Sequence, residues 1–144
     1  MNKIAGVIAL LSGTTHAYLR FGACPNYEPI SDFDTARYMG RWYEVVRDAL
    51  TEYQLFSDCT TVDYDLIPET DYVQVHNRLV WPLYGWYDMV GLAQQNMEGG
   101  ARFNVDFWEI PDPEARVNYN VLSTDYDSYS VVYSCEEQFG GWMH

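Results

Sequence analysis

Apolar and polar side chains alternate along much of this chain with a period of two, the repeat of a β-strand that buries one face. In residues 102–107, Phe103, Val105 and Phe107 alternate with polar side chains. The same alternation recurs over residues 60–66 and, more weakly, over residues 89–93. The chain is therefore predicted to be an all-β protein.

Turn residues divide the chain into short β-type runs about every 10–20 positions, a spacing typical of a β-barrel or a β-sandwich. The seven expected strands are Arg41–Arg47, Cys59–Leu66, Tyr72–Leu79, Tyr87–Ala93, Ala101–Trp108, Tyr119–Ser123 and Ser128–Ser134. The third and seventh runs are mixed on both faces, so the pattern leaves their inward side open. The loops Pro68–Asp71 and Pro111–Glu114 are candidates to bracket an open mouth.

Length and charge limit the number of domains and the kinds of partner. A chain of 144 residues suits one domain with one core. Aromatic residues make up 17% of it, which suits either a packed core or a ring-lined cavity. With 21 acidic and 8 basic residues, the net charge of −13 argues against nucleic acid or an anionic membrane as the partner. An acidic surface also serves solubility.

The first residues have the composition of a targeting segment. Lys3 precedes the apolar run 4–11, and small or polar residues follow up to Ala17. This pattern predicts a secretory signal peptide over residues 1–17, a secreted mature domain over 18–144, and no membrane-spanning segment. An alternative interpretation takes residues 21–24 as a lipoprotein cleavage box, with Cys24 lipidated.

Two sequence blocks resemble the signatures of the lipocalin family. Residues 34–44, DTARYMGRWYE, are similar to its first signature, a short helical turn that enters a strand through Gly-x-Trp. Residues 124–129, TDYDSY, followed by SVVYSC, are similar to its second signature. The resemblance is greatest to the apolipoprotein D group and the bacterial outer-membrane lipocalins. It implies structural roles for Gly40, Trp42, Thr124, Asp125 and Tyr126.

The resemblance also implies an up-and-down antiparallel lipocalin β-barrel, truncated at about seven strands. A lipocalin continues with an eighth strand, which carries an arginine that packs on the Trp of the first strand, and then with a helix. Here Trp142-Met143-His144 can only open that strand. We therefore expect an open barrel edge, which could pair with another protein or with a second copy of the chain.

Three cysteines in a secreted chain predict one disulfide, and the sequence by itself allows all three pairings. In the apolipoprotein D group, a cysteine of the entry segment pairs with one at the end of the seventh strand. The resemblance thus implies a Cys24–Cys135 bond. It leaves Cys59 unpaired, because the family partner of that cysteine lies in the C-terminal tail.

The function implied by the resemblance is the extracellular binding and transport of a small hydrophobic ligand: a fatty acid, retinoid, sterol or pigment. The alternating apolar positions then predict which residues line the cavity, and Tyr64 is the strongest candidate among them. The expected ligand-binding residues are Val62, Tyr64, Phe103, Val105, Phe107, Tyr119 and Val121.

An enzyme is the alternative, because a few lipocalins act as isomerases or de-epoxidases. Cys59 would then be the nucleophile, but no His or Lys lies near it in sequence to lower its pKa. His16, His76 and His144 do not have the spacing of metal ligands. We therefore expect no catalysis, no metal and no cofactor.

Overall fold

The computed structural model describes residues 22–47 and 57–135. These residues form one helical turn, α1 (Thr35–Tyr38), and one antiparallel sheet in which each strand lies beside the next in the chain. The strands are β1 (Gly40–Tyr43), β2 (Asp58–Leu66), β3 (Tyr72–Trp81), β4 (Gly85–Gln95), β5 (Arg102–Asp106), β6 (Tyr119–Thr124) and β7 (Ser130–Tyr133). The expected all-β, up-and-down fold of seven strands is confirmed. The predicted signal peptide and residues 142–144 lie outside the described residues.

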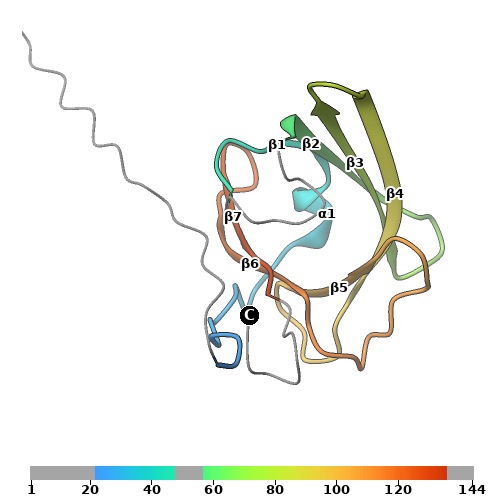
Figure 1. Cartoon of the computed structure of the whole chain (residues 1–144). Helices are drawn as coiled ribbons and strands as arrows, with labels where there is room; N and C mark the ends of the chain where they lie inside the picture. The colour runs from blue at the N-terminus through green and yellow to red at the C-terminus, as the bar shows by residue number, and fades with distance from the viewer. Residues whose placement is uncertain (1–21, 48–56, 136–144) are drawn as a thin grey trace, which may run out of the picture.

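The sheet curls around its own inner face, and Figure 1 shows α1 within the curve. The register aligns alternate residues of neighbouring strands on that face: Tyr64 lies opposite Val75, and Val73 lies opposite Ala93. These four side chains are buried, so the alternation seen in the sequence does mark the inward side. Hydrophobic burial on this face is the main stabilising contribution to the fold.

The entry segment closes one end of the curled sheet. The Asp34 carboxylate caps α1 by accepting the N–H of Arg37 at 3.0 Å. Gly40 then has a φ of 106°, a conformation that suits glycine, and the chain turns there into β1. The Trp42 indole stacks on Tyr38 at 5.0 Å between ring centroids and donates its N–H to the Tyr38 carbonyl. This end is therefore filled by rings.

The β6–β7 turn is held by the side chain of Asp125. Its carboxylate accepts the backbone N–H groups of Asp127, Ser128 and Tyr129 at 2.8–3.1 Å, together with the Ser128 hydroxyl. Thr124 accepts the N–H of Tyr126, and the Tyr126 hydroxyl accepts the N–H of Asp34. The two sequence blocks that resemble the family signatures thus meet at the closed end.

The strand boundaries differ from the predicted ones by up to four residues. β1 ends at Tyr43 instead of Arg47, and β5 ends at Asp106 instead of Trp108. Near the end of β5, a side chain replaces a neighbouring strand: the Asn118 amide makes two hydrogen bonds to the backbone of Val105, at 2.9 Å each. The pattern of apolar residues in a sequence does not show where a side chain, instead of a neighbouring strand, forms the hydrogen bonds of the backbone.

The expectation that Pro68–Asp71 and Pro111–Glu114 bracket one mouth is wrong. The first loop follows β2 and the second follows β5, and in an antiparallel meander these positions lie at opposite ends. The second loop also folds back along the sheet, since the carbonyl of Pro113 accepts the N–H of Met97 in the loop after β4.

Cys24 and Cys135 form a disulfide that ties the entry segment to the residues after β7, the pairing that the resemblance implied. Cys59 is exposed and carries no disulfide. Within residues 22–47 and 57–135, no helix has the length and apolar character needed to cross a membrane.

Candidate ligand-binding site

A small cavity lies inside the curled sheet, above the ring-filled closed end. Its volume is about 20 Å³, room for about one water molecule. The cavity is lined by Tyr38, Met39, Tyr64, Val73, Ala93, Phe103, Val105 and Tyr119. The interior at this level is therefore nearly filled by the protein's own side chains.

Tyrosine hydroxyl groups form a connected network beside this cavity. The Tyr119 hydroxyl lies 2.8 Å from that of Tyr64 and 3.3 Å from that of Tyr38. The Tyr38 hydroxyl lies 2.8 Å from the Ser130 hydroxyl on β7. The network joins α1, β2, β6 and β7, so the polar ends of these rings are satisfied where the rings pack.

Burial keeps the hydroxyl groups of Tyr119 and Tyr38 protonated. Desolvation, reinforced by the neighbouring Tyr64 and Tyr38, raises the pKa of Tyr119 well above its ordinary value of 10. Burial also raises the pKa of Tyr38, against the opposing effect of its hydrogen bonds to Ser130 and Tyr119. The inner surface therefore presents neutral donors and acceptors.

The structure brings four of the seven predicted binding residues to this cavity: Tyr64, Phe103, Val105 and Tyr119. Val62 and Phe107 face the interior further along their strands and are half-buried, packed against the core cluster. Val121 is fully buried and lies in the core away from the cavity lining. Its backbone N–H donates to Ala101, and its carbonyl accepts from Ile30.

Sequence reasoning missed several residues of the inner face. Val73 and Val75 alternate with polar neighbours, but the apolar residues Val80 and Trp81 blur the pattern at the far end of β3. Tyr38 belongs to a helical turn too short to show a periodicity. Only the closure of the sheet over α1 places its ring against Tyr64, with a centroid separation of 5.6 Å.

Gly91 shapes the inner face near Phe107. A Cβ at this position would lie 2.4 Å from the Asp106 carbonyl and 2.6 Å from the Phe107 ring. The absence of a side chain thus lets β4 and the end of β5 approach closely, with the Phe107 ring lying over the glycine. The position of Phe107 depends on this contact.

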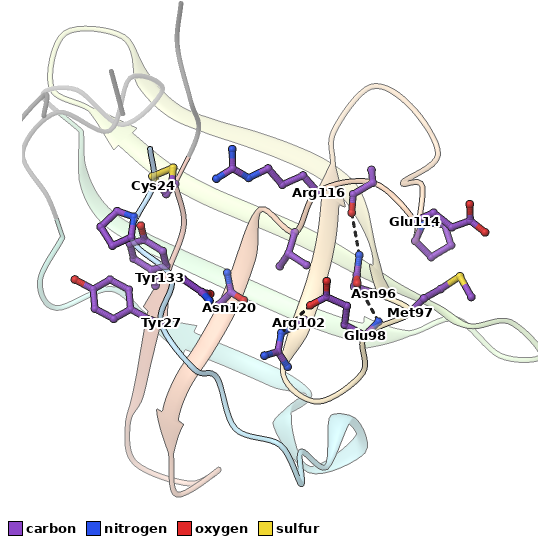
Figure 2. Close-up of a pocket in the computed structure, with 16 residues that line it drawn as sticks. Cys24, Tyr27, Asn96, Met97, Glu98, Arg102, Glu114, Arg116, Asn120 and Tyr133 are labelled. Carbon is purple, nitrogen blue, oxygen red and sulfur yellow. Dashed lines mark hydrogen bonds and ion pairs between the residues drawn. A yellow bond between two sulfur atoms is a disulfide. The ribbon is translucent and has the colours of Figure 1, made fainter. Parts of the chain in front are cut away.

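A larger groove of about 500 Å³ lies on the outer side of the sheet. Its walls come from the entry segment, the loops after β4 and β5, and the outward side chains of β6 and β7. Figure 2 shows Tyr27 and Tyr133 beside Cys24 at one end, and Arg102 with Glu98 and Asn96 at the other. The tyrosine rings meet edge to face at 4.8 Å.

The polar groups of this groove largely serve each other. Arg102 pairs with Glu28 and Glu98 at 3.2 and 3.3 Å. The Asn96 amide donates to Asn104 and to the Ala115 carbonyl, which fixes the loop after β5. These contacts explain the groove as a junction between loops, so the inner face is the stronger candidate for a hydrophobic ligand.

Neither Cys59, the candidate nucleophile, nor His76 lines the internal cavity. Cys59 is exposed at the start of β2, with a φ of 52°. The His76 imidazole lies on the outer face of β3, with its Nε2 2.8 Å from the Asp88 carboxylate. His16 and His144 lie outside the described residues.

A meandering antiparallel sheet that curls over an aromatic, uncharged interior, closed at one end by a Gly-x-Trp entry segment, defines a class of small β-barrel binding proteins. Within that class, the chain belongs to the lipocalins: the family model described as a lipocalin-like domain matches residues 33–142.

The relatives of this chain agree with that assignment. Rat (Rattus norvegicus) apolipoprotein D is 31% identical over 137 residues, which is 94% of this chain and 69% of that protein. The bilin-binding protein of Pieris brassicae is 27% identical, with 90% and 67% covered. Insecticyanin from the tobacco hornworm Manduca sexta superposes with a TM-score of 0.66 at 23% identity, over 83% of this chain and 63% of that one.

Proposed function

We propose that this protein binds and carries a small hydrophobic molecule in the interior of its curled sheet. The observation that carries the proposal is the inner face itself, where β2 to β6 present apolar and aromatic side chains and a few neutral hydroxyl groups. Such a surface favours an apolar ligand, because burial of apolar area stabilises the complex. The name of the bilin-binding protein among its relatives is consistent with this role.

The proposed ligand lies beyond the small cavity, further from the closed end. Tyr64 and Phe103 are only 7% and 6% exposed, so the level of the cavity is packed. Val62 and Phe107 face inward yet stay half-buried, which means that accessible space adjoins them. Val62 and Phe107 are therefore the residues we assign to direct ligand contact, with Val105, Tyr64 and Tyr119 beneath them.

The setting that we propose is extracellular. The signal-like sequence of residues 1–17 and a disulfide between Cys24 and Cys135 both suit a secreted protein. The mature domain would then begin near residue 18. N-terminal sequencing of the secreted protein tests this, and a mature chain that still begins at Met1 would contradict it.

Retinol is a suitable probe of the carrier function, because its fluorescence changes on transfer to an apolar site. We expect the intact chain to take up retinol and Phe107→Glu to lose uptake, since a carboxylate in the apolar interior costs several kcal/mol unless it is paired. Val90→Glu is the matched control, because Val90 lies on β4 and is 50% exposed. Equal retinol uptake by Phe107→Glu and the parent would contradict this site.

A second candidate function is an interaction through the strand edges. Within the described part of the chain, β1 and β7 each pair with a single strand, and Val131 and Val132 on β7 are 48% and 41% exposed. Such an edge accepts a strand from a second copy. Size-exclusion chromatography separates the two functions: a monomer that takes up retinol supports the carrier, and a stable oligomer without uptake supports the edge interaction.

A further inference from the structure

Among the residues that the structure describes, the inner face carries no formal charge along most of its length. Its residues are apolar side chains, tyrosines and small polar groups on β2 to β6 and at the position after β5. They are Thr60, Val62, Tyr64, Val73, Val75, Asn77, Leu79, Met89, Ala93, Phe103, Val105, Phe107, Tyr119 and Val121. All of these are neutral at physiological pH.

The basic side chains are already held elsewhere. From residue 22 onward the sequence has six arginines and no lysine. Five of them form ion pairs, which are Arg37–Asp127, Arg41–Asp63, Arg47–Glu44, Arg78–Asp88 and Arg102 with Glu28 and Glu98. The sixth, Arg116, lines the outer groove. Each arginine of the described residues thus either pairs with a carboxylate or lies in the groove on the outer side of the sheet.

Arg47 lies in the segment that follows β1, and the Glu44 carboxylate neutralises it. The Glu44 N–H donates to the Thr60 carbonyl at 3.0 Å, so Glu44 lies on the same side of the sheet as Trp42 and Thr60. Both Glu44 and Arg47 side chains are about a quarter exposed, and Arg47 also donates to the Ser57 carbonyl at 2.6 Å. A ligand carboxylate that approached Arg47 would therefore compete with the Glu44 carboxylate.

The polar groups that remain inside are hydroxyl groups and the Asn77 amide, all of them uncharged. Tyr119 links Tyr64 and Tyr38 through its hydroxyl, and burial raises the pKa values of Tyr119 and Tyr38, so these two stay protonated. Hydroxyl groups can hold a neutral alcohol or carbonyl, but they supply no charge to balance an anion. The net charge of −13 opposes the approach of an anion from solution as well.

We propose that the interior selects uncharged lipophiles, such as alcohols or esters, over carboxylates of the same carbon skeleton. This inference rests on the carrier function proposed above and narrows its ligand class. An ionised carboxylate would lose its hydration on entry without gaining a counter-ion, whereas a neutral head group loses much less.

The test compares retinol, methyl retinoate and retinoic acid at pH 7.4, with dissociation constants measured by quenching of tryptophan fluorescence. The two neutral probes should bind at least roughly tenfold more tightly than the acid. Equal or tighter binding of retinoic acid would overturn the proposal. If none of the three probes binds, the result contradicts the proposed carrier function, and with it the proposed selectivity.

Two matched variants locate the cause of the selectivity. Glu44→Gln removes the carboxylate that neutralises Arg47 and should tighten the binding of retinoic acid several-fold, while retinol binding, which also reports a folded site, stays the same. Asp63→Asn releases Arg41 on the outer face, where the Arg41–Asp63 contact is 2.7 Å, and should leave the ratio of the two affinities unchanged. An equal effect of both variants, or of neither, would contradict a selectivity set by the inner face.

Discussion

At the scale of single residues, the closed end of this lipocalin depends on tyrosine rings whose hydroxyl groups form hydrogen bonds with one another. Tyr38, Tyr64 and Tyr119 bury their rings in the core and join their hydroxyl groups in one network. Such a network stabilises the fold only while every member is satisfied, because a buried hydroxyl without a partner is costly.

Replacement of Tyr64 separates the contribution of its ring from that of its hydroxyl. Tyr64→Phe leaves the Tyr119 hydroxyl with one fewer partner and should lower the free energy of unfolding by about 1 kcal/mol. Tyr64→Ala also removes a ring that is 7% exposed and should cost ~3–5 kcal/mol. Urea unfolding measures both values. A loss from Tyr64→Ala no larger than that from Tyr64→Phe would show that the ring is not packed.

Asp125 makes the stability of the β6–β7 turn depend on pH. Its hydrogen bonds, first to the Ser128 side chain and then to backbone N–H groups, lower the pKa of the carboxyl well below its ordinary value. A group whose pKa is depressed in the folded state stabilises the fold above its unfolded pKa, and this stability is lost as pH falls through the folded value.

Thermal midpoints measured from pH 6 to pH 2 test this linkage. The midpoint of the parent should fall once the pH drops below about 4. Asp125→Asn should have a lower thermal midpoint at pH 6 and a shallower decline of the midpoint in acid, because the carboxylate that contributes to the pH dependence is absent. Asp65→Asn, at an exposed position on β2, is the control and should follow the parent. If the thermal midpoint of Asp125→Asn declined with pH as steeply as that of the parent, the β6–β7 turn would be excluded as a source of the pH dependence.

At the scale of elements, the sequence predicted strands best where one face is apolar and the other polar. β5 is such a strand, since Phe103 and Val105 face the core and Arg102 faces outward. β3 was ambiguous, because the adjacent apolar residues Val80 and Trp81 interrupt the alternation at its far end. The pairing of its outward residues His76 and Arg78 with Asp88 on β4 leaves no mark on the periodicity of one strand.

The candidate site was less predictable than the strands. The alternation located Val62, Tyr64 and Phe107 on the inner face but could not rank them by depth. Depth depends on α1, which closes one end of the sheet and makes that level a packed core. Tyr38 and Ser130 join the hydroxyl network only through that closure, so neither was expected from local sequence.

The contact of β4 with the end of β5 gives a prediction for Gly91. In Gly91→Ala the new Cβ must displace the Asp106 carbonyl or the Phe107 ring, and we expect a loss of about 1–3 kcal/mol together with weaker retinol uptake. Urea unfolding and retinol titration measure the two effects. Val90→Ala, at the neighbouring outward position, is the control. Parental stability of Gly91→Ala would contradict the close approach of these strands.

At the scale of the whole molecule, the Cys24–Cys135 disulfide joins residues 111 positions apart and therefore encloses almost all of the sheet. In the chain-entropy description, a loop of this length contributes up to about 5 kcal/mol by restricting the unfolded chain. Cys24→Ser should thus lower the thermal midpoint strongly, whereas Cys59→Ser should leave it near that of the parent. Non-reducing peptide mapping that recovered a Cys59–Cys135 peptide would contradict this pairing.

The central claim is that the folded chain holds one hydrophobic molecule in its interior, and native mass spectrometry of the protein purified from its natural source tests it most directly. We expect a complex heavier than the disulfide-bonded chain by the mass of one organic molecule, which is released by organic solvent. We also expect the emptied protein to take up one equivalent of retinol. A spectrum that shows only the mass of the chain, with no uptake of retinol, would contradict the claim.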